Sequence, residues 1–158
     1  MKSESRQVAA EAPVTHGRMD DVASSWKLGT AALLAISAIL GLAMLATDRN
    51  LWTYAPTHAY GLIGFVLVDL AALALVALRG RKMVFRLAAV WGALQALIML
   101  SDIATGAQSF GMAPADFARY LFGLGFYDSN HIAFLFPALF AVNVILAFVA
   151  FFASRKSR

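Results

Sequence analysis

The sequence has no cysteine and few charged residues, and both absences exclude some classes of protein. Without cysteine the chain cannot form disulfides, thiolate metal sites or iron–sulfur ligation. Of its 158 residues 14% are charged and 61% are hydrophobic, whereas soluble domains have roughly 25% and 45–50%. The charges also occur in short blocks between long apolar stretches. This pattern predicts an integral membrane protein.

Motifs that carry enzyme chemistry are also missing. The sequence contains no glycine-rich phosphate loop, no His-Glu-x-x-His zinc motif and no Gly-x-Ser-x-Gly nucleophile motif. We therefore expect the chain to have no catalytic activity on its own, although these absences do not decide whether it is an enzyme. The basic residues, which give a net charge of +4, flank apolar stretches instead of forming one stripe. Nucleic acid is therefore not an expected partner.

Four apolar segments are long enough to cross a bilayer, which needs about 20 residues per helix. The third segment contains Arg86 and Asp102, and it spans the membrane if the Arg86 side chain extends to the interface. Helices are expected because none of the segments shows the two-residue alternation of barrel strands. The fold class is therefore an all-α membrane protein, a four-transmembrane-helix bundle formed by residues 26–158. The expected spans are 28–47, 59–78, 83–104 and 132–153.

Lysine and arginine residues predict how the bundle is oriented. Eleven of the thirteen lie before the first span, between the second and third or in the first turn of the third, or after the fourth, and the other two are Arg49 and Arg119. The positive-inside rule then places both termini in the cytoplasm, in what we expect to be a prokaryotic plasma membrane. Residues 1–25 are expected to form a disordered cytoplasmic tail. A cleaved signal peptide is the competing explanation of the first span, but its positive region would be unusually long.

The third connection has a helical pattern of its own. Pro114 and Asp116 are typical of a first helical turn, and apolar residues follow at helical spacing from Phe117 to Leu124. We expect a short amphipathic interfacial helix that lies on the outer membrane surface. Two other positions remain open, a surface for docking a partner and a lid over the outer end of the bundle.

Each span has one polar residue near the expected bilayer centre. A lipid-facing Asp, Gln or Asn would be costly there, so we expect these side chains to meet inside the bundle. Two interpretations stay open: a hydrogen-bonded polar layer that fixes the register of the helices, and a proton or ion relay centred on the single carboxylate. The residues of this intramembrane polar layer are Ser37, Asp69, Gln95 and Asn143.

Histidines and carboxylates gather at the expected outer end of the spans, where His58, His131, Asp48 and Asp102 lie. Imidazole and carboxylate groups can bind zinc, copper or iron, and His58 with His131 could provide the axial ligands of a haem. No ligand spacing typical of a known site supports either cofactor. The alternative is that both histidines belong to polar segments at helix N-termini and bind no metal or haem.

Together these features predict a non-catalytic subunit of a larger membrane complex, such as a respiratory or oxidoreductase assembly. Its expected partners are the lipid bilayer and either other membrane subunits or further copies of itself. One alternative is an oligomeric proton-coupled carrier or channel that uses Asp69. Another is an electron-transfer subunit that binds haem or metal at His58 and His131.

Overall fold

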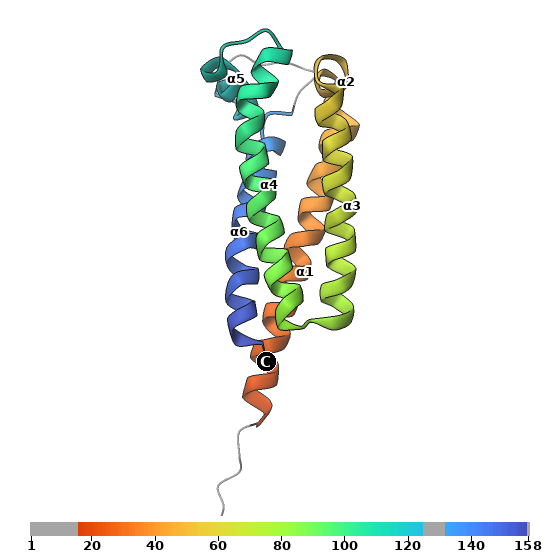
Figure 1. Cartoon of the computed structure of the whole chain (residues 1–158), viewed down its shortest axis with the longest axis vertical. Helices are drawn as coiled ribbons and strands as arrows, with labels where there is room; N and C mark the ends of the chain where they lie inside the picture. The colour runs from red at the N-terminus through yellow and green to blue at the C-terminus, as the bar shows by residue number, and fades with distance from the viewer. Residues whose placement is uncertain (1–15, 125–131, 158) are drawn as a thin grey trace, which may run out of the picture.

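A computed structural model describes residues 16–124 and 132–157 of the chain, with side chains from residue 24 onward. Four long helices run side by side, and two short ones lie together at one end of the bundle (Figure 1). We name this the capped end, and the end that carries the turn between α3 and α4 the basic end. The helices in these residues are α1 (His16–Thr47), α2 (Arg49–Tyr54), α3 (Pro56–Arg79), α4 (Lys82–Ser109), α5 (Pro114–Leu121) and α6 (Leu135–Lys156).

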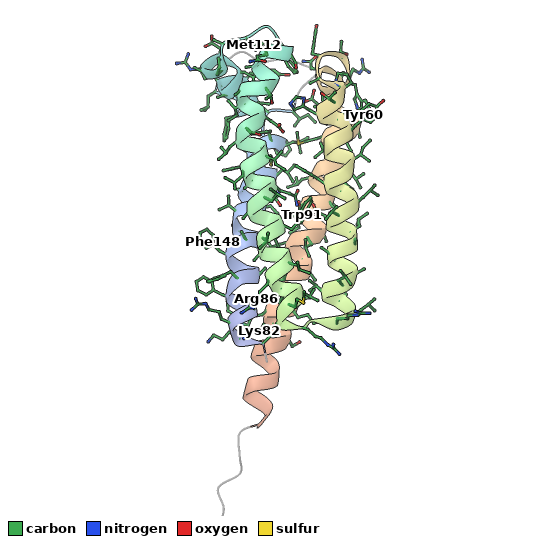
Figure 2. The ribbon with its side chains drawn as sticks, viewed as in Figure 1. Tyr60, Lys82, Arg86, Trp91, Met112 and Phe148 are labelled. Carbon is green, nitrogen blue, oxygen red and sulfur yellow. The ribbon has the colours of Figure 1, made fainter. Side chains whose placement is uncertain are left out.

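The four long helices have the length and hydropathy that a membrane span needs. Their spanning parts have mean hydropathies from 1.8 to 2.5. Large apolar side chains such as Val90 are exposed on the outside of the bundle, and Phe148 points away from it (Figure 2). The expected fold class is therefore confirmed, and the chain is an all-helical integral membrane protein. The spanning parts are Ser24–Thr47, Pro56–Arg79, Lys82–Ser109 and Leu135–Lys156.

Three of the long helices extend beyond the expected spans, whereas α6 begins at Leu135 and not at the expected residue 132. α1 begins at His16, inside the segment 1–25 that was expected as a tail, and residues 1–15 lie outside the described part of the chain. α2 was not predicted at all. It exists because the Asp48 carboxylate caps its N-terminus, accepting a hydrogen bond of 3.0 Å from the backbone N–H of Leu51.

Proline and glycine set the ends of the next helices. Pro56 begins α3 and Pro114 begins α5. In the first turn of a helix the backbone N–H has no acceptor within the helix, so proline loses no hydrogen bond there. Gly80 ends α3 with a φ of 47°, the left-handed conformation that glycine adopts without strain. The chain then turns directly into α4.

Close packing in the bundle is uneven. α1 packs on both α3 and α6, and α4 packs on α6, whereas α3 and α4 make few contacts although they follow each other in sequence. Gly92 allows the approach of α4 to α6, because a Cβ there would lie 2.8 Å from the carbonyl oxygen of Asn143. Gly41 allows the approach of α1 to α3 in the same way, since its Cβ would lie 2.7 Å from the Val66 side chain.

The short helix predicted in the third connection is confirmed as α5, and its apolar side faces the bundle. Phe117, Tyr120 and Leu121 are buried in the core at the capped end. Gly106 of α4 leaves room for the Phe117 ring, which a Cβ at that position would approach to 2.6 Å. Asn50 of α2 donates a 2.9 Å hydrogen bond to the Tyr120 hydroxyl. Of the three positions considered for this helix, its packing corresponds to the lid over the bundle end.

Candidate functional site

The four polar residues predicted for the membrane centre come from four different helices, and all are buried. Ser37 lies on α1, Asp69 on α3, Gln95 on α4 and Asn143 on α6, and none exposes more than 1% of its surface. Each belongs to the inward face of its helix, because residues three, four and seven positions apart share a face. The bundle therefore encloses one polar layer about midway along its length.

Asp69 is the centre of this layer. One of its carboxylate oxygens accepts two hydrogen bonds of 2.7 Å, from the side-chain amide of Gln95 and from the indole N–H of Trp91. Both donors belong to α4, so these bonds connect two long helices that otherwise make few contacts with each other.

The other half of the layer joins α1 to α6. The Ser37 hydroxyl lies 3.4 Å from the side-chain oxygen of Asn143 and is also a hydrogen-bond neighbour of Asp69. Asn143 donates its amide to the backbone carbonyl of Leu139, one turn earlier in α6. The side-chain oxygen of Gln95 is buried and has no hydrogen-bond partner in the described part of the chain. The described bonds thus link the layer to itself and to the helix backbone.

Trp91 was not among the residues predicted for the site. It lies one turn before Gln95 on α4, on the side that faces α3 (Figure 2). The sequence contained a signal, because tryptophan is usually found at the membrane interface, whereas this residue lies in the middle of a span. An indole N–H inside a membrane span needs an acceptor, and Asp69 is that acceptor.

A cavity of about 430 Å³ lies between the polar layer and the capped end. Its walls are mostly apolar and come from the four long helices, from α2 and from α5. Two residues on its rim, Gly61 of α3 and Thr105 of α4, are exposed, so the cavity opens between these two helices. The residues that line it are Met44, Asp48, Leu51, Ala55, Thr57, His58, Gly61, Leu62, Phe65, Ile98, Met99, Asp102, Thr105, Gly106, Phe110, Phe117, Tyr120, Leu121, Phe136 and Leu139.

His58 and Asp102, two of the predicted ligands, come together at this opening. The Nε2 atom of His58 lies 3.5 Å from a carboxylate oxygen of Asp102 and 3.2 Å from the Thr105 hydroxyl. The Nδ1 atom of His58 lies 3.4 Å from the Thr57 hydroxyl. Both side chains are partly exposed, and both line the cavity. Imidazole and carboxylate are therefore held where they can bind a polar group of a molecule inside the cavity.

The remaining predicted ligands are placed differently. Asp48 lines the same cavity, but its carboxylate also caps α2. His131 lies outside the described residues, and with it the proposed haem ligation by two histidines. Within residues 24–124 and 132–157 no three His, Asp or Glu side chains are grouped closely enough to hold a metal ion.

Comparisons with protein-family models, with curated proteins and with solved structures found no match to this chain. The function is therefore inferred from the arrangement of the described side chains. That arrangement consists of a closed polar layer at the centre and an apolar cavity with a polar opening near the capped end.

Proposed function

We propose that this chain is a non-catalytic subunit of a larger membrane complex, such as a respiratory or oxidoreductase assembly, and that its cavity binds a small lipid-soluble molecule. The setting we propose is a prokaryotic plasma membrane, with both termini in the cytoplasm. The observation that carries the binding role is the cavity of about 430 Å³ near the capped end. Ligand sites of this kind are largely apolar, with a few polar groups that orient the ligand.

The side chains favour an uncharged ligand with a flat apolar body and a hydrogen-bonding oxygen. Phe65, Met99 and Leu139 supply apolar contacts, and His58 with the Thr105 hydroxyl supplies hydrogen-bonding groups at the opening. Asp102 lies beside His58 and orients its ring. A quinone ring combines these properties, since it has two carbonyl acceptors on a flat apolar frame.

The polar layer supports a subunit without chemistry of its own. The hydrogen bonds of Asp69 come from Trp91 and Gln95 within the bundle, where they hold α3 and α4 together. A proton relay through Asp69 is for this reason not part of the proposal.

Binding of menadione, a small quinone, to the purified protein tests the cavity. We expect His58→Ala to weaken binding about tenfold, as the loss of one hydrogen bond predicts. Thr53→Ala is the matched control, because Thr53 is exposed on α2 and does not line the cavity. Equal binding by the wild type and His58→Ala would exclude this site.

Extraction in a mild detergent tests the subunit role. Partner chains should accompany the protein in fixed ratio, and a lone monodisperse species would contradict the proposal.

A further inference from the structure

A second hollow, of about 260 Å³, lies at the basic end, far from the cavity described above. It is formed by the first part of the spanning segment of α1, the turn between α3 and α4, and the end of α6. This end of the bundle also carries Lys82 and Arg86 (Figure 2). The inference drawn from it does not depend on the proposed function.

Three cationic side chains surround this hollow. Lys27 comes from α1, Arg79 from the end of α3 and Lys156 from the end of α6, and no acidic residue is among the residues that line it. The ion pairs found in the described part of the chain, His58 with Asp102 and Arg119 with Asp116, are both near the capped end. Three like charges around one small space repel one another unless an anion lies between them.

The side chain of Lys27 is held in place by its surroundings. The stem of Lys27 packs against the turn at Gly80, where an added Cβ would lie 3.2 Å from the Lys27 Cδ atom. Not every cation of this end faces the hollow, since the guanidinium of neighbouring Arg155 lies over the Phe151 ring at 4.8 Å. Lys27, Arg79 and Lys156 therefore share one hollow because three different helices place them there.

Neutral groups around the hollow fit the same kind of ligand. The hydroxyl oxygen of Ser157 is buried and has no hydrogen-bond partner in residues 24–124 and 132–157. Its O–H can donate to an oxygen of an anion in the hollow. Trp26 and Phe85 add apolar surface beside the charges. Tryptophan at the end of a span is typical of the headgroup level of a bilayer.

We propose that this hollow binds a phosphate group, supplied in the membrane by the headgroup of an anionic phospholipid. Phosphate oxygens accept hydrogen bonds from lysine, arginine and hydroxyl donors at once. The position at the end of the spans brings a lipid phosphate to the same level. Free inorganic phosphate has the same chemistry and is the second possible source.

Lipid binding to the full-length protein in detergent, measured by native mass spectrometry, tests this site. Phosphatidylglycerol is compared with phosphatidylcholine, whose positively charged choline group is repelled by the three cations. We expect the triple variant Lys27→Gln, Arg79→Gln and Lys156→Gln to bind phosphatidylglycerol roughly a hundredfold more weakly, because each cation near a lipid surface contributes a factor of about five.

The matched control is the triple variant Arg81→Gln, Lys82→Gln and Arg86→Gln. It removes the same number of charges from the same end but none from the hollow, and we expect it to keep its preference for phosphatidylglycerol. If the first triple variant fails to fold, the single variant Lys27→Gln replaces it, with binding about fivefold weaker.

Added inorganic phosphate then identifies the source of the phosphate group. Displacement of the lipid by inorganic phosphate would support a site for the phosphate itself, and lipid binding that resists inorganic phosphate would support a site for the whole headgroup. Equal binding of the two lipids by the wild type, or equal losses in the two triple variants, would overturn the proposal.

Discussion

The Asp69 carboxylate connects α3 to α4 where these helices make few other contacts. Two donors converge on a single oxygen, so the loss of this oxygen would leave both the indole N–H of Trp91 and the amide of Gln95 without an acceptor. Leaving a buried donor without a partner costs more free energy than the hydrogen bond itself contributes to stability. The carboxylate is therefore a structural connection, whatever else it does.

Replacing Asp69 tests this role at the scale of one residue. We expect Asp69→Ala to lower the stability of the purified protein by about 1–3 kcal/mol, because two donors inside the membrane span lose their acceptor. Asp69→Asn is the control, since its carbonyl oxygen can accept the same two bonds, and its loss should be smaller. Thermal unfolding in detergent measures both. Equal stability of the alanine and asparagine variants would contradict the structural role.

Helical periodicity predicted which polar residues belong to the layer, but not how they pair. Depth and direction depend on sequence position alone, so Ser37, Asp69, Gln95 and Asn143 could be identified without coordinates. Hydrogen bonding between helices depends also on their separation and rotation. Trp91 became a partner of Asp69 because α3 and α4 stand apart, and a long indole reaches across the space between them.

At the scale of the helices, glycine decides which pairs approach closely. Gly92 of α4 lies against the backbone of α6, where a Cβ would come within 2.8 Å of the Asn143 carbonyl oxygen and 3.0 Å of the Ala147 nitrogen. Backbone atoms cannot move aside as the end of a side chain can. The contact between α4 and α6 therefore requires a residue without a Cβ.

The variants Gly92→Ala and Gly64→Ala form a matched pair. We expect Gly92→Ala to destabilise the bundle by about 1–3 kcal/mol, because the two helices must separate. Gly64 lies within α3 with no atom near its added Cβ, so Gly64→Ala should be neutral or stabilising by up to about 1 kcal/mol. Unfolding of both variants in the same detergent gives the comparison. The idea fails if Gly92→Ala is as stable as Gly64→Ala.

The short helices show what the sequence leaves open at this scale. The proline and the apolar spacing from Phe117 onward predicted α5, but its packing on the bundle depends on Gly106, which comes before it in the chain and makes space for the Phe117 ring. Asp48 before α2 is a local signal for a helix N-terminus. The same carboxylate also fits a metal ligand, and that interpretation did not predict the helix. Local patterns predicted helices, and contacts between distant segments decided where the helices lie.

For the whole molecule, the absence of cysteine makes the orientation directly testable. Single cysteines at Ser3, Thr53 and Ala113 would be the only thiols in the chain. We expect an impermeant maleimide to label Thr53→Cys and Ala113→Cys in intact cells, and Ser3→Cys only after the membrane is opened, as the positive-inside rule predicts. The unmodified chain is the control. Labelling of Ser3→Cys alone in intact cells would mean that the bundle is inserted the other way.

The architecture of the whole molecule was the most predictable level. Four long apolar segments leave few arrangements in a bilayer, because each backbone must satisfy its own hydrogen bonds. The cavity was not predictable. It results from the separation of α3 and α4 next to the capped end, where α2 and α5 lie. The residue spacing within a single helix does not predict how far apart two helices lie.

The sideways opening between Gly61 and Thr105 has a consequence for how the cavity would be filled. A lipid-soluble molecule that enters between two spanning helices comes from the bilayer. Its concentration there is set by its partition coefficient, so a strongly lipophilic molecule could saturate the cavity through weak intrinsic contacts. Selectivity would then depend partly on the bilayer itself.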